Sequence, residues 1–435
     1  MKKILMLGGR SWGVVELLKA AKSLGVYTIV TDYNKSNPGK QIADESWTLS
    51  TRDLDALEKK CREKNVDAIF CGINEPNMDV ALELCDRLQL PCYYDQKAWD
   101  FSRNKANFKS LCEATGTSVP KRFYVNDSLD TDDLKNIKYP VVVKVIDLCG
   151  SMGMSFCYDE KQLIEGYEFA RSTSKKYSQS GSQNPEILIE EMIVGKEYTT
   201  YYALAGGEIR LLCITEIMPC PGLKGHANFL FETSLTDNYK LIIDKFNPCI
   251  EKTLKAAGCR DGVAWVEFMM DENQNFYVLE FGHRLSGTMV ELTLPNLIGF
   301  DSYRWVVECQ LGISHSVDDL PSSISSFSGK CGFSYILKST KMVDRIHVIG
   351  LDEIVKIPGV TCSTLFANDE EAAEFAYSGN CGVVTITAKD CEEMCRKIEK
   401  INQTICFMTP EGEDVFRRFN DFDYLRNTYA RALLT

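Results

Sequence analysis

In this 435-residue chain, the two glutamates Glu267 and Glu280 have a spacing that could bring their carboxyl groups together to bind a cation. They lie in two apolar runs, Gly262–Met270 and Asn275–Gly282, and the polar residues between these runs are typical of a hairpin turn. A loop over residues 272–275 would place the two glutamates directly opposite one another, with Cβ atoms roughly 4.5–5.5 Å apart. The expected neighbours on the same face are all apolar: Trp265, Met269, Phe276 and Val278.

Carboxylates that face one another among apolar side chains repel, and a buried charge is costly. A shared proton or a bound cation would relieve the repulsion. Carboxylate oxygens without a nearby His or Cys favour a hard cation, Mg²⁺ or Mn²⁺. The alternative is an offset register in which one glutamate faces solvent. A magnesium ion held by only two carboxylates is commonly completed by phosphate oxygens, so this interpretation predicts phosphate-binding groups elsewhere in the chain.

Candidate phosphate-binding groups occur upstream of the two glutamates. Lys144 lies among valines in a predicted strand, where it either reaches solvent at a sheet edge or binds an anion. A turn containing Gly150, Ser151 and Gly153 follows, and its backbone N–H groups would suit phosphate oxygens, although an ordinary hairpin turn has the same composition. Lys105 stands at a predicted helix start, where a cation is unfavourable unless an anion is near.

The segment Glu190–Glu197 follows a second apolar strand. Its first residues could contact an adenine through backbone N–H and C=O groups, while its last carboxylate takes the ribose hydroxyls. An ordinary acidic turn at the surface is the alternative, and for this segment taken alone it is the more frequent outcome. The segment therefore becomes informative only together with the lysines and the glutamate pair.

The first 100 residues alternate between strand and helix patterns, which predicts a parallel sheet packed against helices. The first turn, Gly8–Gly13, lacks the G-x-G-x-x-G spacing of a dinucleotide site, so we interpret it as a tight strand-to-helix turn. Glu75 follows a predicted buried strand, where the ligand crevices of such sheets lie. A carboxylate at a helix start is an equally good interpretation of Glu75.

Composition excludes several classes of function. The chain has 49 Lys and Arg against 61 Asp and Glu, a net charge of −12, so we expect no general nucleic-acid binding. It has no run of 18 uncharged apolar residues, so we expect no membrane span. Its 18 cysteines are scattered without a CxxC motif and it has four histidines, which argues against a zinc site and for a reducing cytoplasm.

The order of these motifs resembles the ATP-grasp family over about residues 1–310. The residues that carry the resemblance are, in chain order, Lys105, Lys144 with Gly150–Gly153, Glu190–Glu197, Glu267, and Glu280–Gly287. Within the family, the chain is most similar to the carbamoyl-phosphate-synthase-like and L-amino-acid-ligase branch, through Phe229–Ser234 and the tail around Gly350–Phe366.

The resemblance implies an α/β and α+β architecture in three parts. Residues 1–100 would form a parallel-sheet pre-ATP-grasp domain. Residues 101–328 would form the ATP-grasp fold, with a small lid subdomain at about 120–195 and a core at about 196–328. Residues 329–435 would form a C-terminal αβ subdomain. The resemblance also suggests a homodimer.

The resemblance further implies a role for each motif residue. Lys105 and Lys144 would hold ATP phosphates, and Glu267 and Glu280 would bind Mg²⁺ or Mn²⁺. Arg284 would face the acyl phosphate or the substrate carboxylate. The turn that contains Gly150, Ser151 and Gly153 would close over the phosphates. The strand end would contact the adenine through Glu190, Glu191, Met192 and Ile193, and Glu197 would bind the ribose.

The implied activity is that of an ATP-dependent carboxylate–amine ligase acting on a small carboxylate, such as an amino acid, and an amine. The alternatives are a bicarbonate-using enzyme of the same fold and a non-catalytic ATP-binding module. Two departures from the family pattern affect the acceptor side, the part of the site that would bind the acid and the amine. Gly282 stands where the family has a metal-binding Asn, and Trp265 stands where the branch often has His. Candidate substrate residues are Glu75, His226, Glu232 and His283.

Overall fold

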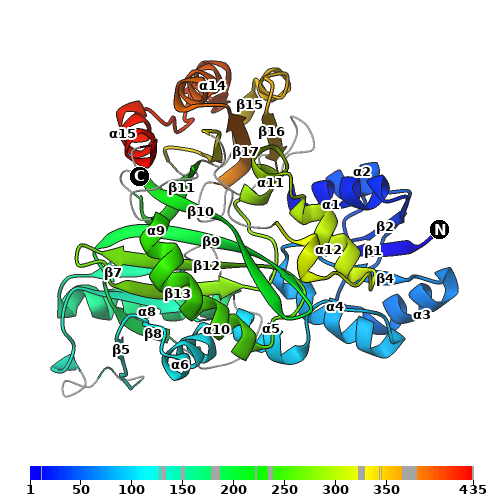
Figure 1. The fold of residues 1–435 in the computed structure, drawn as a ribbon, viewed down its shortest axis with the longest axis horizontal. Coiled ribbons are helices and arrows are strands. Elements are labelled where there is room, and N and C mark those ends of the chain that lie inside the picture. Colours follow the sequence, from blue (N-terminus) through cyan, green and yellow to red (C-terminus); the bar gives the residue numbers. More distant parts are fainter. Residues whose placement is uncertain are drawn as a thin grey trace.

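The computed structural model has the mixed α/β architecture that the sequence predicts (Figure 1). It describes residues 1–10, 12–126, 129, 134–146, 148, 152–177, 187–220, 223–233, 239–321, 329–341, 343, 345–364 and 380–433. Within these residues the strands form a four-stranded parallel sheet, a four-stranded lid sheet, an eight-stranded sheet and a two-stranded ribbon. None of the helices in this described part combines the length and apolar character that a membrane span requires.

The N-terminal residues form the predicted parallel sheet, with strand order β3-β2-β1-β4. Ile4 to Leu7 are fully buried, as expected for a central parallel strand. The elements of this part are β1 (Lys3–Leu7), α1 (Trp12–Ser23), β2 (Tyr27–Thr31), α2 (Pro38–Ile42), β3 (Glu45–Trp47), α3 (Leu54–Lys64), β4 (Ala68–Phe70) and α4 (Glu75–Leu88).

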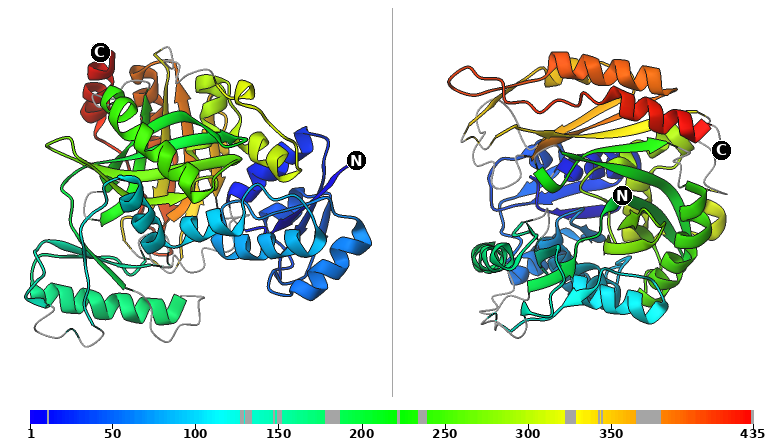
Figure 2. Two further views of the ribbon diagram at one scale, coloured as in Figure 1. Left: turned by 60° about the horizontal axis from the view of Figure 1, so that its bottom comes forward. Right: turned by 90° about the vertical axis from the view of Figure 1, so that its left-hand side faces the viewer.

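Two helices, α5 (Gln96–Arg103) and α6 (Lys105–Thr115), connect this part to the lid sheet. The Asn104 side chain caps α6 by accepting hydrogen bonds from two backbone N–H groups, both at 3.0 Å, which fixes Lys105 at the helix start. The lid has strand order β5-β8-β6-β7 and projects from the rest of the molecule at the lower left of Figure 2. Its elements are β5 (Arg122–Phe123), β6 (Val141–Val145), β7 (Ser155–Cys157), α8 (Glu160–Tyr177) and β8 (Ile187–Glu191).

The eight-stranded sheet has the order β13-β12-β9-β10-β11-β14-β17-β16, and each neighbouring pair is antiparallel. Its strands are β9 (Gly195–Ala205), β10 (Glu208–Cys220), β11 (Leu223–Thr233), β12 (Gly262–Asp271), β13 (Phe276–Gly282), β14 (Cys331–Lys338), β16 (Val360–Thr364) and β17 (Asn380–Ala388). Three of them come from the predicted C-terminal subdomain. The expected boundary near residue 328 therefore falls between strands of one sheet.

The remaining helices and short turns belong to two parts of the chain, one between β11 and β14 and one after β14. Those between β11 and β14 are α9 (Tyr239–Leu241), the π-helical Ile242–Phe246, α10 (Asn247–Ala257), the 3₁₀ turn Val290–Leu292, α11 (Leu294–Ile298), α12 (Ser302–Gln310) and the 3₁₀ turn Val317–Asp319. The C-terminal elements are β15 (His347–Ile349), α13 (Leu351–Ile354), α14 (Cys391–Thr404), β18 (Cys406–Met408) and α15 (Phe422–Leu433), with β15 and β18 forming the ribbon. Helix α15 lies beside β11 at the top of Figure 1.

Candidate active site

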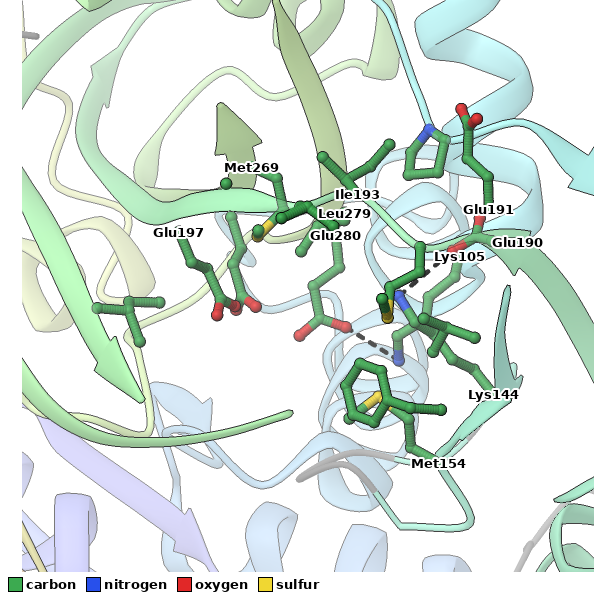
Figure 3. A pocket seen from close by; sticks show the side chains of 18 of the residues that line it. Lys105, Lys144, Met154, Glu190, Glu191, Ile193, Glu197, Met269, Leu279 and Glu280 are labelled. Carbon is green, nitrogen blue, oxygen red and sulfur yellow. Dashed lines mark ion pairs between the residues drawn. The ribbon is translucent and has the colours of Figure 1, made fainter. Parts of the chain in front are cut away.

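A cavity of about 510 Å³ is lined jointly by the lid sheet and by the β9, β12 and β13 end of the large sheet (Figure 3). This is a usual size for a cofactor or substrate site. The charged residues that line it are Lys105, Lys144, Glu190, Glu191, Lys196, Glu197, Glu216, Glu267 and Glu280. Its apolar lining includes Val142, Met152, Met154, Phe156, Ile193, Met269 and Leu279.

The β12–β13 hairpin pairs Glu267 with Glu280 in register, as the spacing predicts. The turn at its tip differs from the prediction. Met270 pairs with Phe276, so the loop is one residue longer than expected, and a β-bulge at Leu279 restores the predicted pairing.

The bulge also changes which neighbours share the face of the two glutamates. Met269 and Leu279 line the cavity beside them. Phe276 and Val278, expected on this face, instead lie in the hydrophobic core beneath the hairpin, where the Phe276 ring packs 5.2 Å from that of Phe246. The prediction was wrong for these two residues because an inserted residue reverses the alternation of side chains.

The two opposed carboxyl groups shift in different directions. Burial raises the pKa of Glu267 well above its usual range, and the neighbouring Glu197 and Glu280 raise it further. Burial also acts to raise the pKa of Glu280, but three cations hold that pKa below its usual value. They are Lys105, whose Nζ lies 3.1 Å from the Glu280 Oε2 atom, Lys144 and Arg284. Figure 3 shows the Glu197 and Glu280 side chains extending toward the same part of the cavity.

This donor set fits a divalent cation that also contacts a bound phosphate. Carboxylate oxygens are the preferred ligands of Mg²⁺, and a cation would offset the repulsion that raises the pKa of Glu267. Among the described side chains, no group of three or more His, Cys, Asp or Glu is arranged to hold a metal alone. The protein would therefore supply two carboxylates, with the remaining ligands coming from phosphate and water.

The lysines near the cavity are fixed by acidic partners. Lys105 donates to the Leu148 carbonyl oxygen at 3.0 Å as well as pairing with Glu280. Lys144 lies 3.3 Å from Glu190, and Figure 3 shows both ion pairs as dashed lines. Both lysines predicted to bind phosphate thus line one cavity with the glutamate pair.

Lys109, the buried partner of the cavity-lining Glu190, is a residue that the sequence analysis missed. It is completely buried, one helical turn beyond Lys105, and pairs with the equally buried Glu190. Burial lowers the pKa of Lys109 to about 8, against the opposing effect of Glu190. Burial acts to raise the pKa of Glu190, but Lys144 and Lys109 keep it below its usual value. The i, i+4 spacing of the two helical lysines was the available signal.

The predicted adenine-binding segment lines the cavity, but its first residues are already engaged. The Glu190 carboxylate bridges two lysines, and that of Glu191 accepts from the Lys121 backbone N–H at 2.8 Å. The backbone N–H groups of Glu191 and Met192 donate to the Lys121 and Pro140 carbonyl oxygens. Adenine recognition would therefore fall to the carbonyl oxygens of this segment and to the backbone of Ile193.

Arg284 and Glu75 connect the core to the N-terminal domain. Arg284 is 8 % exposed and pairs with Glu75, the first residue of α4. A small cavity of about 30 Å³ is lined by both residues together with Lys105, Trp265 and Glu280. Glu75 and Arg284 are thus adjacent to the main cavity, as their predicted substrate roles require.

Of the remaining predicted residues, His283 lines neither cavity, and the others lie beside the main cavity or outside the described part. His283 is completely buried, donates from Nε2 to the Asp261 carbonyl oxygen at 2.9 Å and packs against Tyr93, so we do not retain it as a substrate residue. Gly153 has φ +72° and lies between two methionines that line the main cavity. Gly150 and Ser151 lie outside the described residues. The backbones of His226 and Glu232 lie in β11, and their side chains are outside the described part.

A second group of missed residues joins the C-terminal helix to the main cavity. Tyr424 of α15 donates a hydrogen bond to the buried Glu216, which also pairs with Lys196 at 3.0 Å. All three residues line the cavity. No local sequence signal could relate Tyr424 to a strand residue more than 200 positions earlier.

Residues 137–291, which include β6 and the Glu267–Glu280 hairpin, match the family model of the ATP-grasp domain. The chain contains an ATP-grasp domain. The matched residues include Lys144, Glu190 and Arg284, whereas Lys105 and Glu75 precede the matched range.

Known proteins share the fold of this ATP-grasp domain and of the parts around it. The L-amino acid ligase of Bacillus licheniformis superimposes with a TM-score of 0.72 at 17% identity, over 94% of this chain and 98% of that one. The biotin carboxylase domain of the Hydrogenobacter thermophilus 2-oxoglutarate carboxylase, solved with MgADP and bicarbonate, has a TM-score of 0.74 at 17% identity, over 99% and 94%.

A curated relative is the formate-dependent phosphoribosylglycinamide formyltransferase of Francisella tularensis, 26% identical over 195 residues. The match covers 44% of this chain and 48% of that protein. It therefore spans about half of the relative's length.

Proposed function

We propose that this protein is an ATP-dependent, ADP-forming carboxylate–amine ligase that activates a small acid, such as an amino acid, as an acyl phosphate. The observation that carries the proposal is the opposed pair Glu267 and Glu280 in a cavity that also holds Lys105 and Lys144. Positioned charges without an activated nucleophile suit phosphoryl transfer, in which catalysis is mostly positioning and neutralisation of charge.

We assign the nucleotide to the main cavity. Lys105 and Lys144 would contact phosphate oxygens, with Gly150, Ser151 and Gly153 closing over them. The backbone around Ile193 would form hydrogen bonds with the adenine, and Glu197 would bind the ribose hydroxyls. The apolar side chains lining the cavity support this assignment because an adenine ring needs such surfaces to stack upon.

Glu267 and Glu280 would hold Mg²⁺, or Mn²⁺, against the phosphates. When bound, the ion would supply charge neutralisation and orientation of the phosphate oxygens. Lys105, which pairs with Glu280, would keep that carboxylate ionised and oriented before nucleotide arrives. With Gly282 in place of the family's Asn, a water or a substrate oxygen would complete the coordination.

The reaction would proceed in two balanced steps. The bond between the γ-phosphorus and the ADP oxygen breaks as a substrate carboxylate oxygen bonds to that phosphorus. The amine nitrogen then attacks the acyl carbon, phosphate leaves with the electron pair of its bond, and the amine proton passes to a base. Lys105 and Arg284 would stabilise the negative charge that develops in both steps. Glu75, paired with Arg284, would lie beside the acceptor.

A bicarbonate-using enzyme is a second candidate. Its support is the likeness to a biotin carboxylase domain solved with bicarbonate, and that likeness is as strong as the likeness to an amino acid ligase. ATP turnover driven by bicarbonate alone, without an added acid or amine, would favour this candidate over the ligase.

The proposal is tested with a matrix of small acids and amines that reads out ADP and phosphate, with mass spectrometry of the products. We expect ADP formation to require one acid and one amine together, and the product mass to equal their sum less water. ATP binding without ADP formation across the whole matrix would contradict the ligase and favour a non-catalytic module. Size-exclusion chromatography with light scattering would test the expected homodimer.

A further inference from the structure

The two departures from the family pattern, Trp265 and Gly282, face one another in the β12–β13 hairpin. They are paired residues in the strand register. A Cβ atom built on Gly282 would lie 2.5 Å from the indole Cε2 and Cζ2 atoms and 2.6 Å from Nε1. The indole therefore occupies the space of any side chain at position 282. The two departures form one structural unit, because the large residue requires the glycine.

The same indole orients Arg284. The guanidinium carbon of Arg284 lies 5.1 Å from the centre of the Trp265 ring, within the range of a cation–π contact. Arg284 and Trp265 are each only 8 % exposed. An attraction between two such desolvated groups fixes the guanidinium more firmly than the same contact at the surface would.

The indole N–H group of Trp265 is a buried donor that has no hydrogen-bond partner among the described residues. Buried tryptophans usually pair this group, because an unpaired buried donor loses its hydrogen bonds to water without compensation. Trp265 also lines the small cavity beside Glu75 and Arg284. At about 30 Å³, this cavity has room for a small polar group but not for a complete substrate.

We propose that Trp265 is a substrate-binding residue whose indole N–H group, beside the Arg284 guanidinium, receives a carboxylate oxygen of the acid substrate, and that Gly282 is glycine in order to admit the indole. The proposal rests on the proposed ligase function and assigns the chemistry at its acceptor side. The donor pair selects a carboxylate over an amide of the same shape.

Nuclear magnetic resonance of the ¹⁵N-labelled full chain, with Mg²⁺ and a non-hydrolysable ATP analogue, tests this assignment directly. The chain has five tryptophans, and the Trp265 indole signal is the one that Trp265→Phe removes. The probes are acetate and glycine, with acetamide and glycinamide as controls of the same shape that lack the carboxylate. We expect a saturable shift of the Trp265 N–H signal with at least one carboxylate and none with its amide.

The possible outcomes separate this inference from the proposed function. If neither carboxylate moves the Trp265 signal, or if the amides move it equally, the inference is wrong. If the ATP analogue fails to bind to the same sample, the ligase proposal fails, while the carboxylate titration still decides the role of Trp265.

A double-mutant cycle tests the dependence of Trp265 on Gly282 without an activity assay. Gly282→Ala should lower the melting temperature by several degrees and shift or broaden the Trp265 signal in the wild-type background. In the Trp265→Leu background the same change should have little effect on the melting temperature, because the clashing ring atoms are gone. Equal effects in both backgrounds would contradict the inference that the two residues form one unit.

Discussion

Glu267 and Glu280 lie directly opposite one another across β12 and β13, and their carboxyl groups differ in environment. Partial burial and two neighbouring carboxylates raise the pKa of Glu267, whereas Lys105 and other cations lower the pKa of Glu280 despite its partial burial. Two opposed carboxyl groups are unfavourable for the fold alone. We therefore attribute their placement to a bound cation, and the main predictions follow from this.

Replacing Glu280 by Gln should reduce ADP formation by about 100-fold or more, because it removes a charge that stabilises the proposed reaction site. The unfolding free energy should change by less than ~1 kcal/mol, since the substitution also removes a repulsion. Steady-state kinetics and urea unfolding measure the two effects. The exposed hairpin residue Glu272 provides the control, and Glu272→Gln should change neither. A fully active Glu280→Gln enzyme would defeat the assignment.

The buried pair Lys109 and Glu190 should be important for stability. Lys109→Met leaves Glu190 with Lys144 as its remaining cation, and we expect a loss of about 3 kcal/mol in unfolding free energy. Adding Glu190→Gln should recover part of this loss. The exposed pair of Lys161 and Glu165 provides the control, and Lys161→Met should change stability by less than ~0.5 kcal/mol. Equal losses for the two lysine variants would contradict the interpretation.

The lowered pKa of Lys109 predicts a pH effect of definite sign. Between the folded-state pKa of Lys109, about 8, and its usual pKa of 10.5, the Lys109 side chain stays protonated in the unfolded chain but releases its proton in the folded chain. Stability conferred by this group therefore rises with pH across that interval. The difference in unfolding free energy between wild type and Lys109→Met should grow by roughly 1–3 kcal/mol from pH 8 to pH 10.5. A flat or falling difference would contradict it.

The C-terminal helix should contribute to nucleotide affinity. Tyr424→Phe removes the hydroxyl that donates to Glu216, so Glu216 and Lys196 lose one of the contacts that hold them at the cavity wall. We expect nucleotide binding to weaken about 3- to 10-fold, the range for a single hydrogen bond. Tyr429→Phe removes a hydroxyl of the same helix that donates to the Gly329 carbonyl oxygen instead, and it should bind normally. Equal affinities for both variants would exclude this role.

The sequence predicts the parts of this molecule whose signals are local. Alternating strand and helix patterns predict the parallel N-terminal sheet, and hairpin spacing predicts the pairing of Glu267 with Glu280. The same spacing misplaces Phe276 and Val278, because a β-bulge at Leu279 adds a residue that composition does not reveal.

The residues that sequence reasoning missed depend on contacts between distant segments. Lys109 meets Glu190 only because the fold brings α6 close to the end of β8, and Tyr424 meets Glu216 only because α15 lies beside β11 of the large sheet. The sequence shows Trp265 and Gly282 as two separate departures. Their shared space becomes visible only when the indole is placed over the glycine.

The most direct test of the central claim is calorimetric titration of the full chain with a non-hydrolysable ATP analogue, with Mg²⁺ and again with a chelator. We predict saturable binding that weakens at least ~10-fold without Mg²⁺, because phosphate oxygens and the two glutamates share the ion. We further predict that the double change Glu267→Gln and Glu280→Gln abolishes this dependence on Mg²⁺. Binding that is absent from the wild-type protein, or equal with and without Mg²⁺, would contradict the account.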